Sequence, residues 1–184
     1  MSRPAPCTME TASKDRIFMP SKPSPDISVI IPCRNEERFI RETIERVATQ
    51  DGVGGSFTLE ILIVDGKSDD RTQKMVQERM GSHPTLRLII NEKRITPVAF
   101  NLGITQALGR YICILGAHAE IAPDYLLSCL TVMQQVDADN VGGPWRARGH
   151  GRVGEAIAVA FQTPFAVGGA KGHALDYEGY LDTV

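Results

Sequence analysis

Two short polar segments carry the residue types best suited to ligand chemistry. Residues 32–36 read Pro-Cys-Arg-Asn-Glu, and residues 65–72 read Asp-Gly-Lys-Ser-Asp-Asp-Arg-Thr. Each follows a short apolar run of the kind that predicts a buried strand. The carboxyl ends of parallel strands meet at one edge of a sheet, where open α/β folds bind their ligands. We therefore expect both segments to contribute to one site.

The side chains of these segments suit the edge of a nucleotide base. Arg34 and Asn35 offer hydrogen-bond donors, and Asp65 offers an acceptor for an N–H group. A pyrimidine ring needs that mixture of donors and acceptors. Two plainer interpretations stay open. Arg34 and Glu36 also fit a solvated helix start, and Asp65 also fits an ordinary turn residue.

An alternation of strands and helices must position these residues. Apolar runs predict strands at 27–32, 59–64, 86–90, 111–115 and 140–143. Helices are expected at 40–48, between a Ser68–Asp70 cap and Gly81, at 96–108 with Thr96 as N-cap, at 123–136 and at 154–161. This pattern predicts a Rossmann-type α/β fold, with a mainly parallel sheet and helices on both faces.

Composition narrows the class of protein. The chain has 184 residues, enough for one domain with a core, and a net charge of −2, which offers no basic field for nucleic acid. Its four cysteines form no Cys-x-x-Cys pair, and Cys33, Cys113 and Cys129 lie in or beside apolar runs, so buried thiols in a reducing compartment are expected for these three. No apolar run reaches the roughly 18 residues of a membrane helix. Residues 1–26 predict a flexible N-terminal tail before a domain at 27–184.

Common α/β nucleotide motifs are absent from the sequence. No GxGxxG follows the first predicted strand, and there is no GxSxG. Gly66-Lys67-Ser68 is similar to the end of a phosphate-binding P-loop, but Ile61 stands where that loop needs a glycine. These observations argue against a dehydrogenase, a P-loop enzyme and an α/β-hydrolase.

Four segments together resemble the family 2 glycosyltransferases of GT-A fold, and more narrowly the succinoglycan-type exopolysaccharide enzymes. The segments are VIIPCRNE, ILIVDGKSDDRT, ITPVAFNLGITQALGRYICILGAHAEIAPDYL and DNVGGPWRARGHGRVGEAIAVAFQTPFAVGGA. The resemblance implies transfer of a sugar from a nucleotide-sugar, expected to be UDP-linked, to a saccharide or lipid-linked acceptor in bacterial exopolysaccharide synthesis. It also implies inversion at the anomeric carbon and a cytoplasmic location, with peripheral membrane association of the full-length protein as an option.

The resemblance assigns nucleotide binding to both polar segments and to the helix of the third motif. The residues concerned are Pro32, Arg34, Asn35, Glu36, Asp65, Gly66, Ser68 and Asn101.

After the fourth strand, the family carries Asp-x-Asp, which holds a divalent cation, Mn²⁺ or Mg²⁺, on the diphosphate. Here the corresponding residues are Gly116, Ala117 and His118. The resemblance places His118 at the diphosphate or the cation, with Glu120 as a compensating carboxylate, while a structural histidine is the alternative. Because glycine offers no ligand, we expect the cation to contribute only weakly.

A basic segment and the end of the chain complete the set of candidates. Arg146, Arg148 and Arg152 lie in WRARGHGR, which predicts a mobile loop that clamps a diphosphate or an acceptor phosphate. A solvated basic loop is the alternative interpretation.

The resemblance places the catalytic base beyond Val184, so the chain is interpreted as a truncated donor half with no assigned catalytic residue. The late carboxylates are Asp176, Glu178 and Asp182. Two other functions stay open: a nucleotide-binding module without turnover, and a nucleotidyltransferase-like enzyme. The second would need a glycine-rich basic loop after the first strand, which this sequence lacks.

Overall fold

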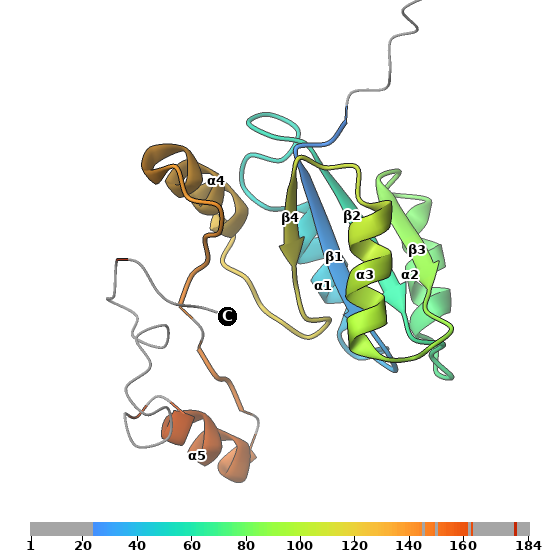
Figure 1. The fold of residues 1–184 in the computed structure, drawn as a ribbon. Coiled ribbons are helices and arrows are strands. Elements are labelled where there is room, and N and C mark those ends of the chain that lie inside the picture. The colour runs from blue at the N-terminus through green and yellow to red at the C-terminus, as the bar shows by residue number, and fades with distance from the viewer. Residues whose placement is uncertain (1–23, 145, 150, 162, 164–178, 180–184) are drawn as a thin grey trace, which may run out of the picture.

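The structure is a computed structural model that describes residues 24–144, 146–149, 151–161, 163 and 179. Within these residues the chain forms four strands and five helices (Figure 1). In chain order the elements are β1 (Ile27–Cys33), α1 (Ile40–Ala48), β2 (Leu59–Asp65), α2 (Thr72–Met80), β3 (Leu86–Ile90), α3 (Thr96–Gln106), β4 (Tyr111–Ile114), α4 (Tyr125–Val136) and α5 (Gly151–Phe161).

The four strands form a single parallel sheet in the order β3-β2-β1-β4. Cys33 pairs with Asp65, and Asp65 pairs with Ile90, so β1, β2 and β3 end at the same level. The segments that follow these strands are therefore neighbours at one edge of the sheet. The predicted parallel α/β architecture is confirmed, and it brings the two polar segments together.

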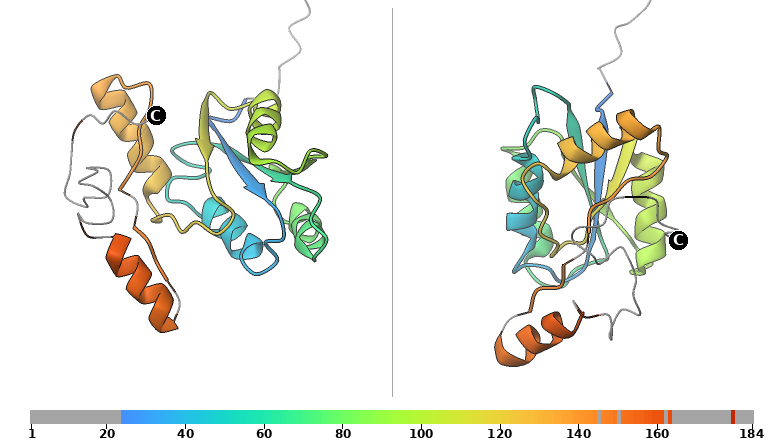
Figure 2. Two further views of the ribbon diagram at one scale, coloured as in Figure 1. Left: turned by 60° about the horizontal axis from the view of Figure 1, so that its bottom comes forward. Right: turned by 90° about the vertical axis from the view of Figure 1, so that its left-hand side faces the viewer.

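Helices cover both faces of the sheet, which explains the uninterrupted apolar runs of the central strands. All seven residues of β2 are buried. On one face, α1 and α2 pack their buried residues Ile40, Ile44 and Val76 against the strands. On the other face, α3 packs Ala99 against Ile30, Leu62 and Val64. Figure 1 shows α3 in front of the sheet, and the right-hand view of Figure 2 shows it on the opposite side from α1.

The helices α4 and α5 lie beyond β4, to one side of the sheet (Figure 2). Leu126 is the buried residue of α4, and Ala158 is that of α5. Several apolar side chains stay exposed in this region, among them Ile112 and Ile114 on β4 and Val153 on α5. Within the described part of the chain, no helix combines the length and apolar character needed to cross a membrane.

The predicted strand at 140–143 is not formed, and this expectation was wrong. Asp137 ends α4 in the left-handed conformation, and the residues after it pass Tyr125 as coil. A Cβ added to Gly143 would lie 3.3 Å from the Tyr125 ring. Paired glycines followed by Pro144 supply neither strand side chains nor a full set of backbone donors, so this segment makes a poor strand.

Two helix starts differ in detail from their predictions. Ile95, not Thr96, is the N-cap of α3. Arg71 is the N-cap of α2; of the residues predicted to cap this helix, Asp70 accepts a hydrogen bond from the Thr72 N–H at 2.9 Å, whereas the Ser68 side chain turns back toward Asp65.

Candidate functional site

A pocket of about 260 Å³ opens at the carboxyl edge of the sheet. The loops after all four strands contribute to its wall. The lining residues most relevant to chemistry are Pro32, Arg34, Glu36, Gly66, Arg94 and His118. Five of these were predicted from the sequence, and the sixth, Arg94, was not.

Hydrogen bonds fasten the corner after β1 to the corner after β2. The Asn35 N–H donates to Ser68 Oγ at 2.9 Å, and Asn35 Oδ1 accepts from the Asp69 N–H at 3.0 Å. The Glu36 N–H donates to Thr72 Oγ1 at 2.9 Å. The two polar segments thus form one structural unit, in which Asn35 and Ser68 shape the corner while Arg34 and Glu36 face the pocket.

Asp65 is the organising side chain of this unit. It is fully buried, and its carboxylate accepts hydrogen bonds from the Ser68 N–H at 2.8 Å, the Ser68 hydroxyl at 2.5 Å and Gln73 Nε2 at 2.6 Å. The Cys33 thiol donates a longer bond to it, at 3.6 Å. Both carboxylate oxygens are therefore occupied by partners from the chain itself.

Electrostatics around the corners follow from burial and hydrogen bonding. Burial, reinforced by the neighbouring Asp65 carboxylate, raises the pKa of the Cys33 thiol well above its usual range. Burial opposes ionisation of Asp70, yet hydrogen bonds from Thr72 and the Glu37 N–H outweigh it and lower the pKa of that carboxyl. The corner therefore presents a neutral thiol and an ionised Asp70 at neutral pH.

Three corners hold a non-glycine residue in the left-handed region of backbone conformation. Asn35, Lys67 and Arg94 have φ angles of 58°, 54° and 59°. They follow β1, β2 and β3 respectively, at the edge where the pocket lies. Such conformations are uncommon outside glycine and cluster at functional sites.

The loop after β4 brings His118 to the pocket. Leu115 N–H donates to the Ile30 carbonyl at 3.0 Å, and the buried Thr43 hydroxyl donates to the Ala117 carbonyl at 2.6 Å. These bonds fix the loop on β1 and α1. His118 Nδ1 lies 3.2 Å from Glu36 Oε1, so residues from the first and third predicted motifs meet here.

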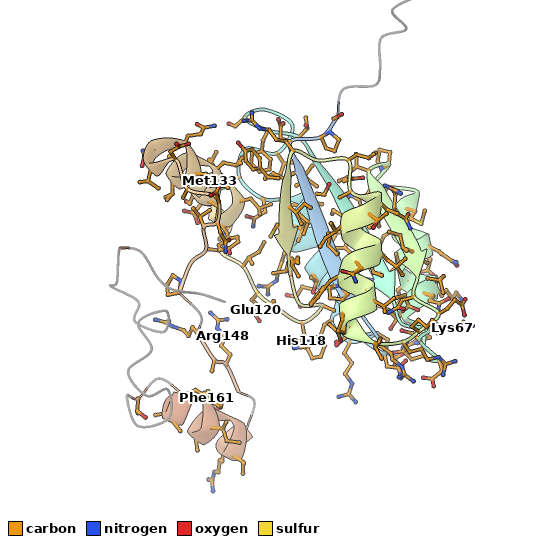
Figure 3. The ribbon with its side chains drawn as sticks, in the orientation of Figure 1. Lys67, His118, Glu120, Met133, Arg148 and Phe161 are labelled. Atoms are coloured by element: carbon orange, nitrogen blue, oxygen red, sulfur yellow. The ribbon has the colours of Figure 1, made fainter. Side chains whose placement is uncertain are left out.

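Glu120 is not among the residues that line the pocket, and its side chain lies toward Arg148 of the loop before α5 (Figure 3). Its Oε2 accepts a hydrogen bond from Arg148 Nη1 at 2.5 Å and lies 3.4 Å from Arg46 Nη1. Arg46 in turn pairs with Glu42. Glu120 therefore links the basic loop to α1 through an ion-pair chain.

The remaining predicted residues lie outside the described wall of the pocket. Asn101 is exposed on α3, whereas Thr96 and Ala99 of that helix line the pocket. Arg146 lies in the coil before α5 and Arg152 in its first turn. The late carboxylates Asp176, Glu178 and Asp182, and most of the predicted N-terminal tail, fall outside the described residues.

The fold is a parallel α/β sheet with a pocket at its carboxyl edge, the place where open α/β folds bind their ligands. The profile of the family "Glycosyl transferase family 2" matches residues 28–168. The chain belongs to this family.

Two members of the family illustrate which proteins this chain is similar to. One is the dolichyl N-acetyl-alpha-D-glucosaminyl phosphate 3-beta-D-2,3-diacetamido-2,3-dideoxy-beta-D-glucuronosyltransferase of Methanococcus voltae, 34% identical over 80% of this chain and 48% of the relative. The other is the succinoglycan biosynthesis protein ExoO of Rhizobium meliloti, 33% identical over 55% of this chain and 28% of the relative. The chain thus spans less than half the length of either, and the resemblance to succinoglycan-type enzymes is confirmed.

A solved structure agrees with the GT-A fold. The mannosyltransferase PcManGT from Pyrobaculum calidifontis, in complex with GDP-Man and Mn²⁺, superposes with a TM-score of 0.54 at 29% identity. The match covers 60% of this chain and 32% of that structure.

Gly116, Ala117 and His118, which align with the Asp-x-Asp motif of the family, do not fit a carboxylate-bound cation. Gly116 has no side-chain ligand, His118 is paired with Glu36, and Glu120 is engaged by Arg148 and Arg46. No group of three or more His, Cys, Asp or Glu side chains among the described residues is placed to hold a metal ion. Mg²⁺ at a diphosphate is bound by phosphate oxygens and water together with one or two carboxylates, and neither Gly116 nor the His118 imidazole supplies a carboxylate.

Proposed function

We propose that this chain provides the donor-binding part of an enzyme that transfers a sugar from a UDP-linked donor to a saccharide or lipid-linked acceptor. The pocket is the observation that carries this proposal, because it is built from corners fastened to each other at the strand ends. Family membership supplies the reaction class. The GDP-Man bound to the mannosyltransferase relative supports a nucleotide-sugar as donor.

In this proposal, different residues of the pocket wall contact different parts of the donor. Glu36 contacts the ribose, and Arg34 contacts the donor from the same corner, since both residues follow β1 and face the pocket. Gly66 leaves room for the nucleotide beside Arg34, because a side chain there would narrow the pocket. His118 faces the diphosphate from the loop after β4, and Arg146, Arg148 and Arg152 remain candidates for an acceptor phosphate.

An inverting transfer needs a base that deprotonates the acceptor hydroxyl as it attacks the anomeric carbon. The described pocket wall presents Glu36 as its carboxylate, and Glu36 is paired with His118. We therefore assign the base to no residue of the pocket. By analogy with the succinoglycan relative, the proposed setting is exopolysaccharide synthesis at the cytoplasmic face of the membrane.

Calorimetric titration with UDP, GDP and ADP tests donor binding. We expect UDP to bind at least about tenfold more tightly than ADP, which corresponds to about 1.4 kcal/mol. Equal affinities for all three would contradict the base preference. No binding of any nucleotide diphosphate would contradict the function itself.

A nucleotide-binding module without turnover is the second candidate, and Gly116 favours it because a carboxylate is missing at the diphosphate end. Transfer from a radiolabelled UDP-sugar to a saccharide acceptor distinguishes the two. We expect these 184 residues to bind UDP with little or no transfer. Robust transfer would exclude the module and would place the base within this chain.

A further inference from the structure

We propose that the diphosphate of the bound donor is neutralised by the guanidinium groups of Arg34 and Arg94, and that a divalent cation adds little to donor binding in this chain. This inference rests on the proposed function, since it concerns how the same pocket binds its donor. It departs from the cation-dependent arrangement suggested by the Mn²⁺ in the mannosyltransferase structure.

The pocket must balance the negative charge of the diphosphate that it is proposed to bind. A nucleoside diphosphate brings two to three negative charges, and burying them without compensation is costly. Gly116 supplies no ligand for a cation, and the Glu120 carboxylate is already neutralised by Arg148 and Arg46. The candidates for the compensating charge are therefore the cationic side chains on the pocket wall.

Arg34 and Arg94 are the arginines that line the pocket, and neither has an ion-pair partner among the described residues. Most other arginines near the site are engaged. Arg71 pairs with Glu37, and Arg148 pairs with Glu120. Lys67, beside the pocket, pairs with Glu92. The two wall arginines are therefore available to an anionic ligand.

Contacts with neighbouring residues fix the positions of both arginines at the pocket. At Gly66, an added Cβ would lie 3.5 Å from both Cβ and Cδ of Arg34, so the arginine stem runs along the glycine. The Arg94 N–H donates to the Asn91 carbonyl at 3.1 Å, and the buried Asn91 side chain donates to the Ile95 carbonyl at 2.9 Å. This loop holds Arg94 in the left-handed conformation at the pocket rim.

Guanidinium groups suit this task because they present paired N–H donors to phosphate oxygens. Hydrogen bonds to charged groups contribute substantially to the free energy of binding. Loss of one arginine should therefore weaken binding by about 10- to 100-fold. An arginine-based site needs no cation to mask the repulsion between the phosphates and the protein.

The test compares UDP with uridine, which lacks the phosphates, by calorimetry in Mn²⁺ and in EDTA. The variants are Arg34→Ala, Arg94→Gly and Arg94→Lys, with Lys93→Ala as the matched control. Arg94→Gly removes the guanidinium without leaving a side chain in the left-handed conformation. Lys93 neighbours Arg94 but is not part of the pocket wall.

We expect the parent to bind UDP equally well, within about threefold, in Mn²⁺ and in EDTA. Arg34→Ala and Arg94→Gly should each weaken UDP about 10- to 100-fold while changing uridine much less, with Arg94→Lys in between. Lys93→Ala should match the parent. Thermal melting of each variant verifies that it is folded.

Gly116→Asp provides the converse experiment. Gly116 lies outside the left-handed region, and an added Cβ would meet only the Ala119 Cβ at 3.8 Å, so the substitution fits the backbone. Restoring a carboxylate should raise the Mn²⁺ enhancement of UDP binding to tenfold or more.

Two results would overturn the inference. One is an enhancement of tenfold or more by Mn²⁺ in the parent; the other is UDP binding by Arg34→Ala and Arg94→Gly that equals the parent. If the parent binds neither UDP nor GDP, the proposed function fails, and this inference fails with it.

Discussion

At the scale of single residues, Asp65 holds the corner after β2 together through its own hydrogen bonds. The sequence predicts that Asp65 accepts a hydrogen bond from the donor base. In the structure, however, its carboxylate is fully buried. Its oxygens already accept from Ser68 and Gln73. A base could reach it only by displacing one of these partners, so its contribution to binding is better explained by the corner it holds together.

Replacing Asp65 with asparagine should therefore affect stability and binding together. The amide has one acceptor oxygen, so donors such as Gln73 Nε2 or the Ser68 N–H lose a partner in a buried site. We expect Asp65→Asn to lower the free energy of unfolding by about 2–3 kcal/mol. Urea denaturation measures this loss, and UDP titration should show weaker binding.

Asp69→Asn is the matched control, because Asp69 is exposed in the same corner. It should behave like the parent in both measurements. Normal stability of Asp65→Asn combined with lost UDP binding would instead restore the direct role of Asp65 at the base.

Sequence reasoning located the two corners but not every residue at the pocket. The strand-end rule was sufficient for Arg34, Glu36 and Gly66, because the elements before them carry strong apolar patterns. Arg94 was missed because it stands in Asn-Glu-Lys-Arg-Ile-Thr, a polar loop without a recognisable motif. Its position after a third strand at the same sheet edge was the signal that could have identified it.

At the scale of elements, the contact between α3 and β1 depends on a glycine. A Cβ added to Gly103 would lie 2.4 Å from Cγ2 of Ile30, a side chain that is completely buried. The helix can approach the sheet this closely only because Gly103 has no side chain. Since Thr96 and Ala99 of α3 line the pocket, this contact also places one of its walls.

We expect Gly103→Ala to destabilise the protein by about 1–3 kcal/mol, because the extra methyl overpacks the core between α3 and β1. Gly81→Ala is the control. Gly81 has a helical φ of −66°, and an added Cβ would meet only the Glu78 carbonyl oxygen at 3.8 Å. That variant should be as stable as the parent or gain about 0.4–1 kcal/mol. Equal stability of both variants in urea denaturation would contradict the close contact.

The order of elements was predictable, whereas some of their ends were not. The first four strands carry long apolar runs, and each is present close to its predicted bounds. Residues 140–143 have the composition of a weak strand, and their path is decided by contact with Tyr125, which a local pattern does not encode. Gly109, just after the predicted end of the helix at 108, has a packing role that no local pattern shows, because an added Cβ would lie 2.5 Å from the Ser28 N atom.

At the scale of the whole molecule, several ionisable groups are packed in their neutral form. Burial raises the pKa of Cys113 from 9.0 to about 11, with the neighbouring Cys129 adding to the effect. Burial likewise raises the pKa of Tyr125 to about 12. These side chains line the region between β4 and α4. The expectation of buried thiols is met by Cys33, which is buried, and in part by Cys113 and Cys129, which are half-buried.

The folded state favours the neutral thiol, so this contribution to stability is complete below about pH 9 and is lost as the pH rises toward 11. We expect the free energy of unfolding, measured with urea, to fall between pH 8 and pH 10.5. Cys113→Ala should show a shallower fall, because it removes one of the groups responsible. The same slope in parent and variant would show that Cys113 does not contribute.

The fastening of the corner after β1 to the corner after β2 also bears on the energetics of ligand entry. Hydrogen bonds within the chain itself join Asn35 to Ser68 and Asp69, and Glu36 to Thr72. A ligand that binds at these two corners does not need to bring them together. Its binding therefore costs little of the conformational entropy of the corners. Complex formation at these two corners should therefore resemble docking onto a rigid surface, with selectivity set by shape and charge.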